Sequence, residues 1–317
     1  MEPLTPPSLE TIRAAADRLR GTAVRTPLLP LDAPECPAAI HLKLENLQPI
    51  GSFKIRGAGN AMLAAGARAL RAGVVTASAG NMAQGVAWHA RRMGIPCRVV
   101  VPEDAPRTKL DAVERLGGEV IRVPFDAWWR AIVERRYPGL LGTFVHPVSD
   151  PDVVAGNGTT GLEILEDLPD ADTVLVPYGG GGLVSGIAAA VKALDPGVRV
   201  LACEVETAAP LAASFAAGKP VSVERRPSFV DGIGGSSVLP EMWPMVRDLV
   251  DGTITVSVDE TAAAVRFLAE RGRVIAEGAG AVPVAAALSG RAGEGKIVCV
   301  VSGGNIDPGK LAELLVR

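Results

Sequence analysis

Apolar and polar positions alternate in two different rhythms between residues 73 and 147. Short apolar runs predict strands, and apolar residues spaced three or four apart predict helices. Glycines and prolines separate these segments. The predicted strands are 73–80, 95–104, 119–124 and 142–147, and the predicted helices are 81–94, 105–118 and 126–137, the last capped by Asp126.

A second series of the same kind begins near residue 152. Its predicted strands are 172–182, 198–206 and 296–304, and its predicted helices are 152–168, 183–197, 208–218, 259–271, 279–289 and 307–317. Strands that alternate with helices predict parallel sheets covered on both faces. We therefore expect two α/β lobes, with ligands at the carboxyl ends of strands, in a cleft between the lobes.

Composition fits a globular enzyme of one large domain or two ordinary ones. The chain has 317 residues, of which 48% are hydrophobic and 21% charged. The net charge is −3 without a basic block, so we expect no nucleic-acid partner and interpret the scattered arginines as solvated helix faces. The start MEPLTPPSLE does not resemble a signal peptide, and no uncharged apolar run reaches the ~20 residues of a membrane span.

The four cysteines are far apart in the sequence. Cys97, Cys203 and Cys299 lie in strand-like apolar runs, where we expect them to fill the core. No CxxC or HxxxH spacing occurs, so no zinc site is expected. These features predict a reducing, cytoplasmic compartment.

Four consecutive glycines stand between a predicted buried strand and a predicted helix. They are Gly179, Gly180, Gly181 and Gly182 in VLVPYGGGGLVSGIAAAV. Glycine lets the backbone approach a ligand, and the N–H groups at a helix start favour an anion such as phosphate. The loop is neither GxxxxGK[ST] nor a clean GxGxxG, although Glu204 at the end of the next strand keeps a dinucleotide interpretation open.

Lys54 occupies an unusual position for a lysine. The chain has seven lysines, and this one follows Gly-Ser-Phe at the start of a small-residue helix. A lysine together with a phosphate cradle suggests pyridoxal phosphate, whose aldehyde forms a Schiff base with a lysine. We interpret the other six as solvated charges, with Lys43 on a strand surface; they are Lys43, Lys109, Lys192, Lys219, Lys296 and Lys310.

Five motifs in order carry a resemblance to a known family. They are GSFKIRGA (51–58), SAGNMAQGVA (78–87), PYGGGGLVSGIA (177–188), EGAGA (277–281) and SGGN (302–305). Together they resemble the fold-type II pyridoxal-phosphate enzymes, in particular the threonine/serine dehydratases and serine racemases. The resemblance implies two lobes with open, mostly parallel sheets, as in the tryptophan synthase β chain. The implied division is a large cofactor-binding domain (1–72 plus 147–317) and a small inserted domain (73–146).

The resemblance also implies a role for each matching residue. Lys54 would form the Schiff base and act as the base, with Phe53 packed against the cofactor ring. Asn81 would bind the ring hydroxyl, Gly179 to Gly182 the phosphate, and Ser302 the pyridine nitrogen. The substrate carboxylate would bind at the helix start formed by Ser78, Ala79, Gly80, Asn81 and Met82.

A neutral Ser302 favours prompt loss of a β-substituent, because it does not force protonation of the ring nitrogen. The implied reaction is dehydration and deamination of L-threonine or L-serine to a 2-oxo acid and ammonia. Ala79 stands where racemases carry a serine, and it has no proton to give, so dehydratase is preferred to racemase. Met82 replaces a histidine common in dehydratases and leaves the substrate preference open.

Several points stay open at this stage. Glu204 and the carbonyl of Ala208 match a cation site of some relatives, but Pro210 replaces its aspartate; otherwise Glu204 is interpreted as a solvated charge at a strand end. Glu277 is a cleft residue of unassigned role, and Asp231 is a cofactor-loop residue or a turn former. The alternatives are a serine racemase, a 3-hydroxyaspartate dehydratase or a non-catalytic small-molecule-binding protein. A homodimer without membrane contact is expected.

Overall fold

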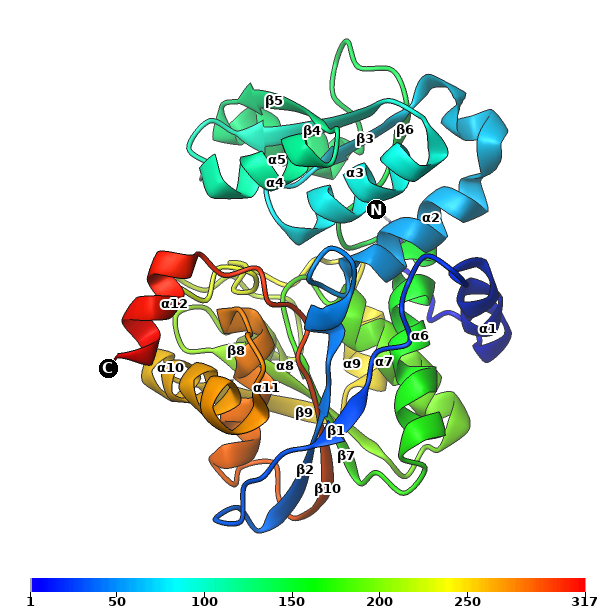
Figure 1. Cartoon of the computed structure of the whole chain (residues 1–317). Helices are drawn as coiled ribbons and strands as arrows, with labels where there is room; N and C mark the ends of the chain where they lie inside the picture. The colour runs from blue at the N-terminus through cyan, green and yellow to red at the C-terminus, as the bar shows by residue number, and fades with distance from the viewer. Residues whose placement is uncertain (1, 106, 317) are drawn as a thin grey trace.

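The protein, described by a computed structural model over residues 2–105 and 107–316, has two α/β lobes (Figure 1). Within these residues six strands form the sheet of the larger lobe, with order β1-β2-β10-β7-β8-β9. β1 pairs antiparallel with β2, and the remaining pairs are parallel. The strands are β1 (Leu28–Pro30), β2 (Ala38–Lys43), β7 (Thr173–Pro177), β8 (Arg199–Val205), β9 (Gly252–Val256) and β10 (Gly295–Val300).

The smaller lobe is built on a parallel sheet with order β5-β4-β3-β6 in the described part of the chain. Its strands are β3 (Val74–Ala77), β4 (Cys97–Pro102), β5 (Glu119–Val123) and β6 (Thr143–Phe144). These sheets confirm the predicted mostly parallel α/β architecture. The domain boundaries at residues 72/73 and 146/147 stay a prediction.

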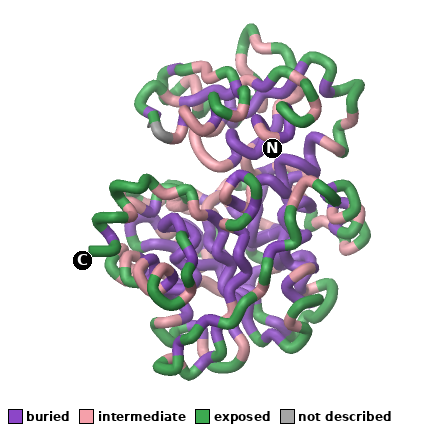
Figure 2. The backbone as a smooth tube through the Cα atoms, viewed as in Figure 1, coloured by how far each residue is buried: buried purple, intermediate pink, exposed green. Residues whose placement is uncertain are grey.

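Helices cover both faces of each sheet, which buries the strands (Figure 2). In the larger lobe, α10 and α11 pack on one face and α6, α7 and α9 on the other. In the smaller lobe, α2, α3 and α4 pack on one face and α5 on the other. The bounds are α1 (Leu9–Arg18), α2 (Lys54–Ala69), α3 (Asn81–Met93), α4 (Arg107–Arg115), α5 (Phe125–Glu134), α6 (Pro151–Asp167), α7 (Gly182–Leu194), α8 (Pro210–Ala217), α9 (Trp243–Leu249), α10 (Val258–Phe267), α11 (Gly278–Leu288) and α12 (Pro308–Leu315).

Most predicted elements are present, with shifted ends. The predicted Asp126 cap is wrong, because α5 already begins at Phe125, after Pro124 in extended conformation, so Asp126 lies in the first helical turn. The helices α1 and α9 and the strands β1 and β9 were not predicted. Residues 106 and 317, within the predicted helices 105–118 and 307–317, lie outside the described residues. No helix in the described part of the chain has the length and apolar character needed to cross a bilayer.

Two basic residues are buried, although we expected from the sequence that solvent would surround them. Lys43 is fully buried, and its Nζ lies 2.6 Å from Glu163 Oε2. Arg56, only 2% exposed, forms ion pairs with Glu45 at 2.8 Å and with Glu163 at 2.7 Å. The interpretation of Lys43 as a surface residue was wrong because α6 covers that side of β2 and brings Glu163 to it. This buried network anchors the first turn of α2.

Candidate active site

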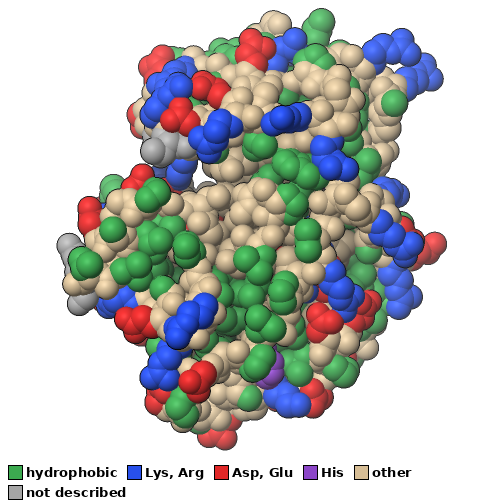
Figure 3. All heavy atoms as spheres, in the orientation of Figure 1, with side chains coloured by type: hydrophobic (Ala, Val, Ile, Leu, Met, Phe, Trp, Pro, Cys, Tyr) green, Lys and Arg blue, Asp and Glu red, His purple; other side chains and the backbone are tan. Residues whose placement is uncertain are grey.

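A cavity of about 510 Å³ lies where the two lobes meet. It is lined from residues that follow the carboxyl ends of strands in both sheets, including β3, β4 and β5 of the smaller lobe and β7 and β10 of the larger. Figure 3 shows the surface hollowed between the lobes. This location agrees with the position expected for a ligand site in parallel sheets.

Lys54 is the first residue of helix α2 and lines this cavity. Its Nζ donates a hydrogen bond to the Pro147 carbonyl at 2.7 Å and lies 5.1 Å from the centroid of the Phe53 ring. Burial lowers the pKa of the amine to about 8, and the nearby Glu277 carboxylate opposes this shift. An amine with such a pKa is partly uncharged near neutral pH, which suits a nucleophile or a base.

The segment before Lys54 is held against the SGGN motif. Phe53 N donates to Ser302 O at 3.0 Å, and Gly304 N donates to Gly51 O at 2.9 Å. An antiparallel bridge joins Ser52 to Gly303 between these two bonds. Two motifs some 250 residues apart in the sequence therefore form one wall of the cavity.

The glycine loop connects β7 to α7 as predicted and exposes its backbone to the cavity. Gly181 has a φ of +97°, a conformation that glycine adopts without strain. A Cβ atom at Gly180 would lie 2.6 Å from the methyl groups of Val148, and one at Gly182 would lie 3.0 Å from the Val148 carbonyl oxygen. The unpaired N–H groups at the start of α7 make this loop a fitting cradle for a phosphate.

Asn81 is held in a chain of three polar side chains, between Asn305 and Glu277. Asn305 Nδ2 donates to Asn81 Oδ1 at 2.7 Å, and Asn81 Nδ2 donates to Glu277 Oε1 at 2.9 Å. Burial raises the pKa of Glu277 to about 7, the Asp231 carboxylate raises it further, and the bond from Asn81 opposes the rise. The orientation of the Asn81 amide is thus fixed from both ends.

Ser302 is 2% exposed and lines the cavity directly after β10. Its hydroxyl makes no hydrogen bond to any other described residue. A buried hydroxyl at a cavity wall without a protein partner is suited to pair with an atom of a bound group.

The loop after β3 leads directly into α3, which begins at Asn81. Ser78 Oγ accepts a hydrogen bond from Gly80 N at 3.2 Å, and this bond shapes the turn. The first N–H groups of α3 have no partner within the helix, as at any helix start. Met82 is 1% exposed and belongs to the core of the smaller lobe, and both Met82 and Ala79 line the cavity.

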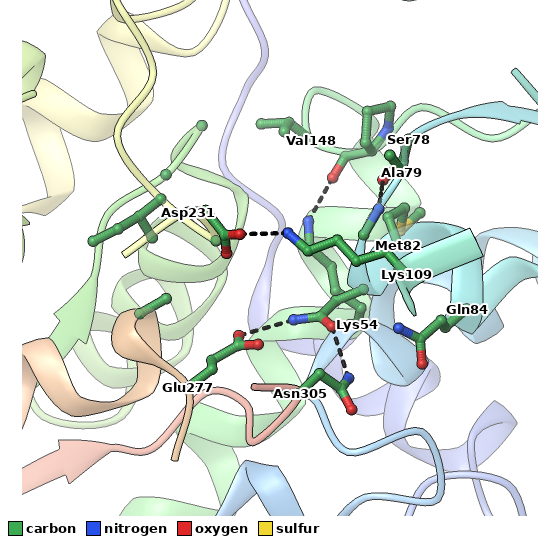
Figure 4. Close-up of a pocket in the computed structure, with 18 of the residues that line it drawn as sticks. Lys54, Ser78, Ala79, Met82, Gln84, Lys109, Val148, Asp231, Glu277 and Asn305 are labelled. Atoms are coloured by element: carbon green, nitrogen blue, oxygen red, sulfur yellow. Dashed lines mark hydrogen bonds and ion pairs between the residues drawn. The ribbon is translucent and has the colours of Figure 1, made fainter. Parts of the chain in front are cut away.

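Lys109 and Asp231 connect the two lobes across the cavity. Lys109 Nζ on α4 lies 2.7 Å from Asp231 Oδ2, which belongs to a loop of the larger lobe (Figure 4). The sequence suggested that Lys109 is a solvated charge. In the fold it forms an ion pair instead, because the Asp231 carboxylate lies next to it. Asp231 is more than a turn former for the same reason.

Glu204 lies apart from the cavity lining. It is 1% exposed, and its two oxygens accept hydrogen bonds from the N–H groups of Leu211 and Ala212, both at 2.8 Å. Burial raises the pKa of Glu204 to about 7, and the two backbone bonds oppose this. The interpretation as a solvated charge was wrong, because Glu204 binds the start of α8. Within residues 2–105 and 107–316 no group of three or more His, Cys, Asp or Glu is placed to hold a metal.

Sequence reasoning did not assign several residues that line the cavity. Asn305 was available as the last residue of the quoted SGGN motif, and Gln84 lies within the quoted SAGNMAQGVA. Nothing in the sequence indicated that Trp128 or Val148 lines a cavity, because only the fold brings the segments after β5 and β6 there.

These features together fit pyridoxal phosphate. The Lys54 amine, with a pKa of about 8, suits its aldehyde. The glycine backbone suits its phosphate, and the unpartnered Ser302 hydroxyl suits a ring nitrogen. The phosphate cradle follows β7 and Ser302 follows β10, two paired strands of one sheet. The cofactor ring and its phosphate would therefore lie along a single sheet edge.

Comparison with known proteins gives the family. The chain is 44% identical to an L-threonine ammonia-lyase of Geobacter sulfurreducens, over 96% of this chain and 77% of that protein. It is 39% identical to the catabolic L-threonine dehydratase of Escherichia coli, over 98% and 96%. The structure of maize serine racemase superimposes with a TM-score of 0.91 at 35% identity, covering 98% of each chain. The family model for pyridoxal-phosphate dependent enzymes matches residues 19–303, and the chain belongs to that family.

Proposed function

We propose that the protein is an ammonia-lyase that converts an L-3-hydroxy amino acid, such as L-threonine or L-serine, into a 2-oxo acid and ammonia. The observation that carries the proposal is the Lys54 amine in the same cavity as the glycine cradle and the neutral Ser302. The names of the relatives, L-threonine ammonia-lyase and L-threonine dehydratase, support the same reaction.

The residues that would hold the cofactor are those named from the sequence. Lys54 would bind its aldehyde, Gly179 to Gly182 its phosphate, Asn81 its ring hydroxyl and Ser302 its ring nitrogen, with Phe53 packed at the ring. When bound, the cofactor supplies an electron sink that stabilises negative charge at the substrate Cα.

Lys54 is positioned to serve as the general base. Its amine has a pKa of about 8 because of burial, so it accepts a proton near neutral pH. The bond to the Pro147 carbonyl holds Nζ at one place in the cavity. The proton at the substrate Cα would move to Nζ of Lys54. The β-hydroxyl would take up a proton and leave as water, and water would hydrolyse the released enamine to the 2-oxo acid and ammonia.

The loop of Ser78 to Met82 would orient the substrate. The free N–H groups at the start of α3, together with the helix dipole, favour a carboxylate. Ala79 in this loop presents a methyl group to the cavity. Racemisation needs a second proton donor on the other face of Cα, and a methyl group cannot supply it. This favours elimination over racemisation.

A panel of amino acids with product analysis by mass spectrometry tests the proposal. L-Threonine or L-serine should yield a 2-oxo acid and ammonia rather than the D-isomer. Lys54→Ala should lower turnover by at least about 10³-fold, the scale of a lost acid–base group, and remove the absorbance of the lysine-bound cofactor. Lys219→Ala, at an exposed loop lysine, is the matched control and should retain both. Full activity in Lys54→Ala, or a cofactor-free protein even after cofactor addition, would refute the proposal.

The same proposal includes a cytoplasmic homodimer. The four cysteines are free, and three of them are buried, which fits a reducing compartment. The resemblance to dimeric pyridoxal enzymes supports two copies. Light scattering should give twice the chain mass of 32.7 kDa, whereas a mass equal to that of one chain would contradict the dimer.

A further inference from the structure

The cavity has two walls, and each wall faces a different reactant. The glycine cradle and Ser302 follow strands β7 and β10 of the larger sheet. The carboxylate loop at Ser78 to Met82 follows β3 of the smaller sheet. In that sheet β4 pairs with β3 and β5 pairs with β4, all parallel. Residues that follow β4 and β5 therefore lie on the side of β3 opposite to β6, whose following residue Val148 meets Gly180 of the glycine loop.

Aromatic and apolar residues predominate in the wall at this position, which also contains Asp104 and Lys109. Pro102 and Ala105 come from the end of β4, and Phe125 and Trp128 come from the first turn of α5, directly after β5. The two rings contact each other with centroids 5.4 Å apart. Trp128 is half-buried and rests on the core beneath α5, whereas Phe125 is 58% exposed at the cavity rim.

This wall is larger than threonine or serine requires. Their β-carbons carry a methyl group or a hydrogen, which cannot cover two aromatic rings and a proline. Aromatic rings gain from contact with another ring beyond the burial of area alone. On the basis of the proposed function, we infer that the preferred substrate is an L-3-hydroxy amino acid with an aromatic or similarly large apolar group on Cβ, selected by Trp128 and Phe125.

The charges along this wall argue against a β-carboxylate instead. Lys109 is neutralised by Asp231 at 2.7 Å, and Asp104 adds a further carboxylate to the cavity lining. Arg225 lines the cavity from an exposed loop of the other lobe, and it is the cation that a 3-hydroxyaspartate would need. The two substrates therefore use different residues, and experiment can separate them.

The first test compares kcat/KM of the holoenzyme for L-threo-3-phenylserine, L-threonine and L-threo-3-hydroxyaspartate. Phenylserine should exceed threonine by at least about tenfold, the discrimination that an apolar pocket can provide. A preference for threonine or for hydroxyaspartate would overturn the inference.

The second test changes the wall. Trp128→Ala should lower the phenylserine-to-threonine ratio of kcat/KM about tenfold, and Trp128→Phe should restore most of it. Trp129→Ala is the matched control, because Trp129 is the next residue, is 45% exposed and lies outside the cavity lining. The ratio does not depend on the amount of folded enzyme. Equal ratios in Trp128→Ala and Trp129→Ala would overturn the inference.

The third test measures binding without reaction. L-Phenylalanine carries the ring but no β-hydroxyl, and L-alanine is its counterpart without the ring. Calorimetry on the holoenzyme should give a Kd for phenylalanine about tenfold below that for alanine, and this difference should shrink in Trp128→Ala. Equal Kd values would overturn the inference.

The tests separate the two proposals from each other. Selective phenylalanine binding without 2-oxo acid formation from any hydroxy amino acid would refute the ammonia-lyase and keep the aromatic wall. Turnover of threonine without any preference for a ring would keep the ammonia-lyase and refute the wall.

Discussion

The two walls of the cavity are built in different ways. The wall at the larger sheet consists of backbone from four glycines, with a buried Ser302 beside it. The wall at the smaller sheet consists of side chains, including the rim residue Phe125 at the start of α5 and the paired Lys109 on α4. Backbone geometry cannot change without changing the fold, whereas side chains at a cavity rim can be exchanged while the fold is kept. The comparison shows how one scaffold can keep a cofactor site constant and vary the substrate site.

The largest effect on stability is expected at α2, the helix that begins at the cavity residue Lys54. Arg56, in the first turn of α2, neutralises Glu45, which is fully buried. Arg56→Leu leaves this carboxylate without its partner and should lower the free energy of unfolding by about 3–5 kcal/mol. Urea denaturation measures this loss. A variant as stable as the wild type would show that the buried network does not anchor α2.

The backbone wall can be tested by adding one methyl group. Gly180→Ala places a Cβ atom 2.6 Å from the Val148 methyl groups, so either the cradle or Val148 must shift. Such overpacking costs about 1–3 kcal/mol, and we expect cofactor affinity to fall about tenfold or more. Gly179→Ala, whose Cβ would meet nothing nearer than 3.6 Å, should lose less. Absorbance titration with cofactor measures both, and the reverse order would contradict a rigid cradle.

Glu204, which lies outside both walls, is expected to make the stability of the folded protein depend on pH. Its pKa of about 7 in the folded protein lies above the ordinary value of 4.5 because of burial. The folded state then binds more protons than the unfolded state between these values, so this group's stabilising contribution is present at low pH and is lost as pH rises from 4.5 to about 7.

Glu204→Gln removes this titration. The difference in Tm, wild type minus variant, should therefore decrease as pH rises through that window. Thermal unfolding at a series of pH values measures it. A difference that stays constant or grows with pH would contradict the raised pKa.

The smallest effect is expected at the ion pair between the walls. Lys109 and Asp231 are 30% and 51% exposed, and ion pairs of this kind contribute less than about 1 kcal/mol. Lys109→Ala should lower the free energy of unfolding by no more than this, and added salt should reduce the difference. A loss as large as that of Arg56→Leu would show that this exposed ion pair contributes as much to stability as the buried network.

The sequence by itself determined the local features of this protein. The strand and helix rhythms predicted most of the elements, because side-chain periodicity follows from the backbone geometry of each element. The glycine loop after β7 and the lysine at the start of α2 were predicted because four glycines follow a predicted strand and Lys54 precedes a run of small residues. Their conformations depend on residues that are close together in the chain.

Only the tertiary structure decided which distant residues meet. The two hydrogen bonds of Asn81 join it to residues 196 and 224 positions away, and no period in the sequence encodes such a pairing. Lys43 appeared solvated because its strand alternates, until α6 brought Glu163 against it. Trp128 became part of the cavity lining because β4 and β5 lie beside β3 in the sheet. Strand order is set by long-range packing, so the chemistry of the second wall could be identified only in the folded protein.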